Sequence, residues 1–270
     1  MRFLQRRHGR VAYDLRGADN TGPLVVCVPG MGSVRASFRF LAPALAAQNH
    51  RVAVMDLRGH GDSDTTFDDY GDEATGSDVL ALVTELGDAP ALVVGNSMGA
   101  AAAAWAAAER PDLVSGLVLV GPFLRDAAGG AALRLLMRLM LLRPWGPALL
   151  RGYLTKLYSG RVPEGHAAHE AAVLAALRPR DRYRAITRTV TGTTHAPVTA
   201  RLPEVAAPSL VVMGEADPDW KDPAAEAAWI RDRIGSEVLM VPEAGHYPHE
   251  QRPDLVNPAV LEFAERVCRG

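Results

Sequence analysis

Apolar and polar positions divide this chain into two alternating kinds of segment. One kind is a short, unbroken apolar run rich in β-branched residues, which is typical of a strand buried on both faces of a parallel sheet. The other is a longer segment with helix-forming composition or apolar residues at helical spacing. The predicted strands are residues 24–28, 52–55, 91–94, 116–120, 209–213 and 237–241, and the predicted helices are residues 38–47, 77–86, 100–110, 224–234 and 256–267.

Two regions depart from this alternation. Residues 3–15 alternate loosely between apolar and polar positions and predict a β-hairpin. Residues 122–207 contain helix-like patterns but no convincing strand. Because alternating strands and helices imply a mostly parallel sheet with helices on both faces, the strand-free region is expected to form a helical cap over the carboxyl edge of that sheet. The predicted core is therefore residues 1–121 and 208–270, and the predicted cap is residues 122–207.

The composition is that of a globular protein. The 270 residues are 48% hydrophobic, which is enough to bury a core, and the net charge of −2 shows no basic excess that would favour nucleic-acid binding. The two cysteines, Cys27 in an apolar run and Cys268 near the C-terminus, are poorly placed for a structural disulfide. They favour a reducing compartment, so we expect the protein to be cytoplasmic. The composition leaves the oligomeric state open.

Nothing in the sequence predicts a membrane span. The first eight residues have no apolar signal core. The most apolar stretch, residues 133–142, is interrupted by Arg134 and Arg138. It is too short and too charged to cross a bilayer.

A serine between two glycines is the clearest chemical feature. Gly95-Asn96-Ser97-Met98-Gly99 joins the predicted strand 91–94 to an alanine-rich predicted helix. A strand, a sharp turn with a serine and a helix are the context of a nucleophile elbow, in which glycines allow the strand and the helix to approach closely. The elbow lifts the serine hydroxyl above the sheet at a helix N-terminus, where backbone N–H groups favour negative charge.

Two more side chains are expected at the same sheet edge. Asp217 follows the predicted strand 209–213, and His246 follows the predicted strand 237–241. Parallel strands bring their carboxyl ends together, so Ser97, Asp217 and His246 can meet although they are far apart in sequence. Asp219 is an alternative acid, Asp222 a weaker one, and His249 competes with His246.

Together these motifs resemble the α/β-hydrolase superfamily, of the kind with a helical lid after the sixth strand. The resemblance is carried by the elbow, residues 56–63, residues 214–218 and residues 245–253, and by the chain order Ser, Asp, His. It implies an α/β-hydrolase fold: an eight-stranded, mostly parallel sheet with helices on both faces and the cap after strand 6.

The resemblance also implies the roles of the residues. Ser97 is the nucleophile, His246 is the base and then the acid, and Asp217 orients the imidazole. The backbone N–H groups of Met98, which follows the nucleophile, and of Met31, in the loop after the third strand, form the oxyanion hole. That loop begins with Pro-Gly where the superfamily often has His-Gly. Related enzymes with other chemistry carry aspartate at the elbow, so a serine favours acyl transfer.

The predicted cap is basic. Thirteen of the 29 Lys and Arg residues but five of the 31 Asp and Glu residues lie between residues 123 and 207, so this segment carries +8 and the remainder −10. Such a lid could steer an anionic substrate or an acidic acyl carrier protein toward the site, although arginines exposed on amphipathic helices are the simpler interpretation.

Apolar residues at helical spacing in the cap could form the floor of an acyl pocket, although such spacing more often reflects packing between helices. The predicted pocket residues are Leu136, Met137 and Met140 of the cap, with Gly30 and Asn96 of the core.

The favoured function is therefore hydrolysis of a small-molecule carboxylic ester with an apolar acyl side. A carbon–carbon bond hydrolase is the second hypothesis, because the elbow, with Asn96 before the serine, resembles the elbow of enzymes that cleave ring-fission products. A thioesterase or a perhydrolase-like activity would use the same residues, and a binding protein would not need them. No metal or cofactor is expected. His60 is expected to brace its own turn, and His166, His169 and His195 are expected to be solvated.

Overall fold

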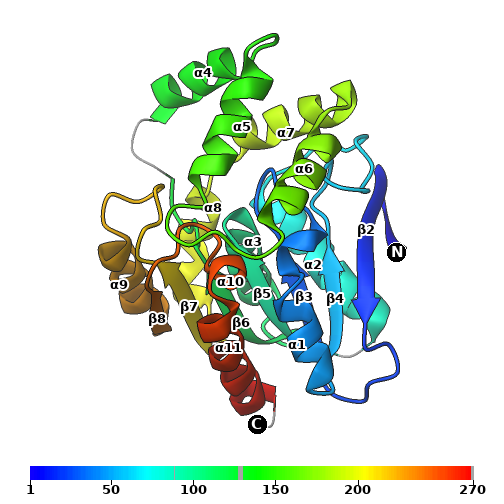
Figure 1. Cartoon of the computed structure of the whole chain (residues 1–270). Coiled ribbons are helices and arrows are strands. Elements are labelled where there is room, and N and C mark those ends of the chain that lie inside the picture. Colours follow the sequence, from blue (N-terminus) through cyan, green and yellow to red (C-terminus); the bar gives the residue numbers. More distant parts are fainter. Residues whose placement is uncertain (88, 127–129, 269–270) are drawn as a thin grey trace.

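The computed structural model describes residues 1–87, 89–126 and 130–268, with the backbone alone for residues 130–134. An eight-stranded sheet with the order β1-β2-β4-β3-β5-β6-β7-β8 runs through the molecule (Figure 1). The strands β1 and β2 pair antiparallel, as do β2 and β4, and all other neighbours are parallel. The strands are β1 Arg2–Arg6, β2 Gly9–Arg16, β3 Leu24–Val28, β4 Arg51–Met55, β5 Ala91–Asn96, β6 Val114–Val120, β7 Ser209–Gly214 and β8 Glu237–Val241.

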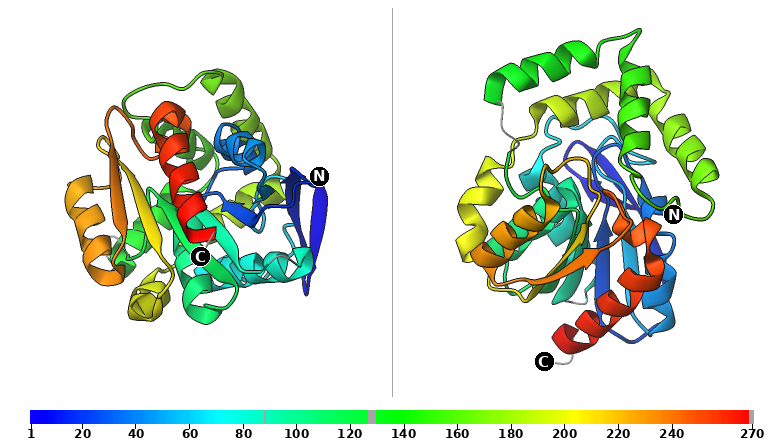
Figure 2. Two further views of the ribbon diagram at one scale, coloured as in Figure 1. Left: turned by 90° about the horizontal axis from the view of Figure 1, so that it is seen from below. Right: turned by 60° about the vertical axis from the view of Figure 1, so that its left-hand side comes forward.

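Helices cover both faces of this sheet, which confirms the predicted fold class (Figure 2). The apolar side chains of α1 and α11 pack on one face, and those of α2, α3 and α9 pack on the other. Because both faces are covered, β3 and β5 are buried at every position. The helices of the core are α1 Leu41–Ala47, α2 Asp72–Leu86, α3 Met98–Glu109, α9 Pro223–Ile234, α10 Pro248–Gln251 and α11 Pro253–Cys268, with a 3₁₀ turn, η1, at Arg35–Phe38.

The segment between β6 and β7 contains the helices that stand above the carboxyl edge of the sheet (Figure 1). We call residues 122–207 the cap. Within the part of the chain that the structure describes, no helix is long and apolar enough to cross a membrane. The cap helices are α4 Gly130–Met140, α5 Gly146–Lys156, α6 His166–Leu177, α7 Arg180–Gly192 and α8 Ala196–Arg201, followed by a 3₁₀ turn, η2, at Leu202–Glu204.

Two predicted helices differ most from the structure. The helix expected over residues 38–47 is divided into η1 and α1. Helix α2 begins at Asp72 rather than at residue 77. Asp72 and Glu73 lie in its first turn, where negatively charged side chains interact favourably with the helix dipole. The Asp72 side chain also bonds His195 of the cap, a tertiary contact that no local pattern reveals.

Candidate active site

Ser97 lies at the turn between β5 and α3 in a strained backbone conformation. Its φ of 56° and ψ of −120° place a non-glycine residue in a sparsely populated region, which costs about 1–3 kcal/mol and is common at functional sites. The close approach of strand and helix requires both flanking glycines. A Cβ at Gly95 would lie 2.2 Å from the carbonyl oxygen of Gly99, and one at Gly99 would lie 2.2 Å from that of Val28.

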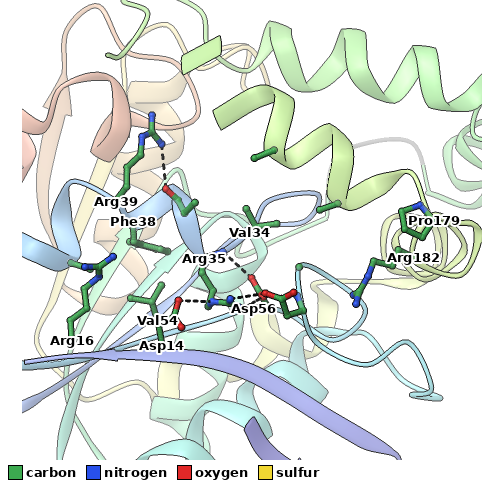
Figure 3. A pocket seen from close by; sticks show the side chains of 16 residues that line it. Asp14, Arg16, Val34, Arg35, Phe38, Arg39, Val54, Asp56, Pro179 and Arg182 are labelled. Carbon is green, nitrogen blue, oxygen red and sulfur yellow. Dashed lines mark hydrogen bonds and ion pairs between the residues drawn. The ribbon is translucent and has the colours of Figure 1, made fainter. Parts of the chain in front are cut away.

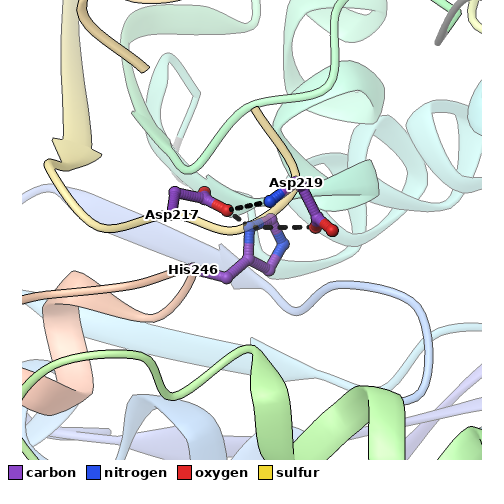
Figure 4. A group of neighbouring side chains, drawn as sticks. All are labelled: Asp217, Asp219 and His246. Atoms are coloured by element: carbon purple, nitrogen blue, oxygen red, sulfur yellow. Dashed lines mark hydrogen bonds and ion pairs between the residues drawn. The ribbon is translucent and has the colours of Figure 1, made fainter. Parts of the chain in front are cut away.

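The structure places Asp217 and His246 side by side (Figure 4). Asp217 follows β7 and His246 follows β8, and both side chains are buried. The imidazole Nδ1 lies 2.8 Å from Oδ2 of Asp217, so the ring donates a hydrogen bond to the carboxylate. Burial lowers the pKa of His246, but the negative charge and hydrogen bond of Asp217 outweigh it, and the pKa is raised above 6.5.

Asp219 is a second carboxylate beside the same ring. Its Oδ2 lies 3.6 Å from Nδ1 of His246, farther than the Asp217 oxygen. The backbone N–H of Asp219 donates to Oδ1 of Asp217 at 3.0 Å, so this turn holds Asp217 in place. Burial raises the pKa of the Asp219 carboxyl. The contacts therefore favour Asp217 over Asp219 as the partner of His246.

The loop that carries His246 lies against the elbow. The side-chain amide of Asn96 donates to the carbonyl oxygens of His246, at 3.2 Å, and of Val120, at 3.0 Å. The ring of Phe123 packs edge-on to His246 at 5.7 Å between centroids, and its backbone N–H lies 3.5 Å from the carbonyl oxygen of Ser97. These contacts join the residue before the serine, and the serine itself, to the histidine loop.

The expected oxyanion loop also touches the serine. A Cβ at Gly30 would lie 2.8 Å from Cβ of Ser97. Two residues along, the backbone N–H of Gly32 donates to Nε2 of His60 at 3.0 Å, and Nδ1 of His60 donates to the carbonyl oxygen of Arg58 at 2.9 Å. Burial lowers the pKa of His60 to about 4, which keeps the ring neutral and able to accept. His60 thus braces its own turn, as expected, and also holds the loop that contains Met31.

The cap reaches the same groups from above. The backbone N–H of His246 donates to the carbonyl oxygen of Leu157, at the end of α5, at 2.9 Å. The Tyr153 hydroxyl, also on α5, donates to Oδ1 of Asp219 at 2.6 Å. Neither contact could be predicted from the sequence, because the pattern of α5 does not say which core residue each of its side chains meets.

Two predictions about which residues line the substrate pocket are wrong. Asn96 is fully buried, its amide is used in the backbone hydrogen bonds above, and it lines neither of the two cavities described below. Leu136, Met137 and Met140 are 51%, 40% and 43% exposed on the outer helix α4 and do not pack over the site. Helical spacing identifies an apolar stripe but not what the stripe faces.

A small cavity of about 20 Å³ lies instead between the expected oxyanion loop and the cap. The core contributes Gly32, Ser33 and Tyr247 to it. Its apolar wall comes from α5 and α6 of the cap, and the residues concerned are Leu154, Val173 and Leu174, with Tyr158, His169 and Glu170 beside them. Sequence reasoning missed these cap residues because they are ordinary members of helical patterns.

The other histidines are less exposed than expected. His195 is buried and its Nδ1 lies 2.7 Å from Oδ2 of Asp72, while its ring packs 5.9 Å from that of Phe123. His169 is buried 3.6 Å from the Glu250 carboxylate, which also accepts from Arg39 and Tyr158. The expectation that these two rings are solvated is therefore wrong, since they form buried contacts between the cap and the core.

A larger cavity of about 480 Å³ lies away from the serine, between the core and helices α6 and α7 (Figure 3). Arg16, Arg35, Arg39 and Arg182 contribute to its wall. Its charges are largely neutralised from within, because Arg35 bonds Asp14, Asp56 and Asp62. None of Ser97, Asp217 and His246 lines this cavity, so it is separate from the candidate site.

Asp217, Asp219 and His246 also have ligand atoms within 4.8 Å of one another, a spacing that could hold a metal ion. However, Nδ1 of His246 already donates to Oδ2 of Asp217, so these two atoms are engaged with each other. The group therefore fits a histidine oriented by a carboxylate better than a metal centre.

Comparison with known proteins identifies the family. A family model described as the alpha/beta hydrolase fold matches residues 23–253. The chain is 29% identical to the 2-(acetamidomethylene)succinate hydrolase of Mesorhizobium japonicum, over 97% of this chain and 96% of that protein. Among solved structures, it resembles a thermophilic esterase of Thermogutta terrifontis (TM-score 0.79, 23% identity, 96% of this chain and 94% of that one) and the enol-lactonase of Burkholderia xenovorans (TM-score 0.79, 21% identity, 95% and 97%).

Proposed function

We propose a function from one premise: the chain belongs to the alpha/beta hydrolase family. On that premise the protein is a serine hydrolase that cleaves a small-molecule carboxylic ester through an acyl-enzyme intermediate. The observation that carries this proposal is the buried Asp217–His246 pair, held by hydrogen bonds against the strained turn of Ser97. The 2-(acetamidomethylene)succinate hydrolase of Mesorhizobium japonicum supports hydrolysis as the class of reaction.

The proposed reaction begins when the Ser97 hydroxyl attacks the ester carbonyl and passes its proton to Nε2 of His246. Asp217 holds the proton on Nδ1 and stabilises the imidazolium that forms. The carbonyl oxygen becomes an oxyanion, which the N–H groups of Met31 and Met98 stabilise. As the tetrahedral intermediate collapses, His246 returns the proton to the leaving alkoxide. Water then attacks the acyl-enzyme in the same way, with His246 again acting as base and then as acid. This step releases the carboxylic acid and regenerates Ser97.

The small cavity supports a short acyl side. Its walls are mainly apolar, with Leu154, Val173 and Leu174 from the cap, and it lies against residues 32–33 of the expected oxyanion loop. A cavity of about 20 Å³ is little larger than the roughly 10–15 Å³ that is needed to hold one water molecule. We therefore expect acetyl and propionyl esters to be cleaved faster than long-chain esters.

An anionic substrate, or an acyl group on an acidic carrier protein, is a second possibility for the same site. The cap carries +8 while the remainder carries −10, which supports attraction of an anion toward the lid. The name of the Mesorhizobium relative describes a succinate derivative, which is a dicarboxylate. If the cap recognises an anion, the preference for esters with a carboxylate should weaken as ionic strength rises.

The carbon–carbon hydrolase hypothesis is less well supported. It depends on Asn96, and the side-chain amide of that residue donates to the backbone of Val120 and His246.

The state of the cysteines bears on the cellular compartment. Both cysteines are free, which supports our proposal that the protein works in a reducing, cytoplasmic compartment.

Labelling with a fluorophosphonate and hydrolysis of p-nitrophenyl esters test the proposal. Mass spectrometry should find the covalent adduct on Ser97, and Ser97→Ala should abolish both labelling and ester hydrolysis. Ser37→Ala is the matched control, because Ser37 is also buried but belongs to η1, and it should keep both. An adduct on another residue, or full activity in Ser97→Ala, would reject the proposed mechanism.

A further inference from the structure

The outer part of the cap exposes an unusual number of large apolar side chains. We call residues 135–151, from α4 into α5, the cap arm. Every residue from 135 to 140 is exposed, and α4 lies at the outer end of the molecule, away from the sheet (Figures 1 and 2). Soluble monomers rarely leave such a surface uncovered unless it binds something. The exposed apolar side chains are Leu135, Leu136, Met137, Leu139, Met140, Leu142, Trp145 and Leu149, with exposures between 40% and 60%.

The charge around this surface has one sign. Residues 127–163 contain six Lys and Arg residues and no Asp or Glu. Within the cap arm, Arg138, Arg143 and Arg151 are exposed beside the apolar side chains. The chain outside the cap is acidic, so charge is separated along the molecule. A partner for this surface must therefore accept apolar side chains and bring negative charge.

An anionic lipid surface meets both requirements. Leucine and methionine side chains can enter the boundary of the acyl chains, arginines can pair with headgroup phosphates, and a tryptophan such as Trp145 favours the same depth. A second copy of the chain fits less well, because a two-fold contact would bring the same arginines against each other. Helix α4 has 11 residues, about 16 Å in length, so it could lie in the interface but not cross it.

We propose that the cap arm binds the surface of membranes that contain anionic lipid, with the acidic core facing away from the membrane. The binding does not depend on the proposed catalysis, because none of its residues belongs to the candidate triad. It would place the small cavity near the membrane, since Leu154 lies on α5 just beyond the arm.

Co-sedimentation of the full chain with vesicles tests this proposal. Vesicles of phosphatidylcholine alone are compared with vesicles that also contain phosphatidylglycerol. We expect binding to the second kind, with an affinity that falls as salt rises. Replacing Arg138 and Arg151 together by Gln should weaken binding about 25-fold, since each basic residue near such a surface contributes about fivefold. Ser97→Ala should bind as the unmodified chain does, so the outcome is separate from that of the proposed function.

Apolar variants complete the test. Leu136→Asp with Met140→Asp should abolish sedimentation, whereas Leu255→Asp, at an exposed leucine of α11, should leave it unchanged. Circular dichroism checks that the variants are folded. Absence of binding to both kinds of vesicle, binding without a preference for anionic lipid, or loss of binding in Leu255→Asp would overturn the proposal. Light scattering gives a further check. The proposal would be overturned if the unmodified chain is a dimer and the double Asp variant is a monomer, because a second copy of the chain would then cover the cap arm.

Discussion

The core and the cap use apolar residues in opposite ways. In the core, β3, β5 and most of α3 are completely buried, and glycines let backbones approach to distances that no other residue permits. In the cap, α4 exposes apolar side chains to solvent, and the described apolar cluster is small. Close packing in the core therefore fixes the positions of Ser97, Asp217 and His246, and under the proposed function the cap would control which substrates reach them.

The two regions meet at the candidate site itself. From the cap, Leu157 accepts a hydrogen bond from the backbone of His246, and Tyr153 bonds Asp219. On another side, Arg182 of α7 donates to the carbonyl oxygen of Ser63 at 2.7 Å, in the turn that His60 braces. The cap is thus attached to the elements that hold His246 and the loop of Met31.

The largest effect should come from the core carboxylate. Asp217→Asn is expected to lower kcat by about 10⁴-fold, because the histidine loses the group that fixes its tautomer and stabilises its cation. Asp219→Asn is the matched variant and should lower kcat by less than tenfold, since its oxygen lies farther from Nδ1. Steady-state hydrolysis of p-nitrophenyl acetate measures both. Equal losses in the two variants would show that the acids share the role.

A pair of glycine variants compares packing in the two regions. Gly99→Ala should destabilise the protein by roughly 3 kcal/mol or more, because its Cβ would overlap the carbonyl oxygen of Val28. Gly152→Ala, inside cap helix α5, should stabilise it by about 0.5–1 kcal/mol, since no described atom beyond the helix's own backbone lies within 4 Å of the new Cβ and alanine favours a helix. Urea unfolding measures both. A destabilising Gly152→Ala would mean that α5 is more closely packed than the contacts indicate.

Acyl-chain preference should depend on the cap. Leu154→Ala enlarges the small cavity, so the ratio of kcat/KM for the butyrate ester to that for the acetate ester should rise about tenfold. Leu150→Ala is the control, because Leu150 is buried in the cap cluster but does not line this cavity. It should reduce stability without changing the ratio. An unchanged ratio in Leu154→Ala would exclude this cavity as the acyl pocket.

The smallest effect should appear in the pH dependence. The base must be neutral, so kcat/KM should rise with pH through the pKa of His246, which lies above 6.5. Asp219 contributes to that raised pKa, and its replacement by Asn should move the acid limb to lower pH. Tyr153→Phe should move the limb in the same direction but less. Burial already raises the pKa of Asp219, and loss of the tyrosine hydrogen bond would raise it further, so less negative charge would face His246. A limb displaced to higher pH would contradict this assignment.

Much of the core could be predicted because its signals are local. Apolar runs located every strand of the parallel sheet, and the spacing of glycines around Ser97 predicted the turn between β5 and α3. Sheet topology then placed Asp217 and His246 on one edge, where the structure brings them within hydrogen-bond distance. The errors in this region are helix boundaries, such as the start of α2, and the pocket role predicted for Asn96.

The fold, the elbow and the chain order of Ser97, Asp217 and His246 could be predicted from the sequence alone, because strand periodicity and turn chemistry depend on neighbouring residues. The position of the cap on the core could be learned from the three-dimensional structure alone. It buried His195 against Asp72, joined His60 to Gly32 and turned Leu136 toward solvent. An apolar stripe specifies that one helix face can be buried, but its partner is selected by packing between segments tens of residues apart, and no local pattern records that choice.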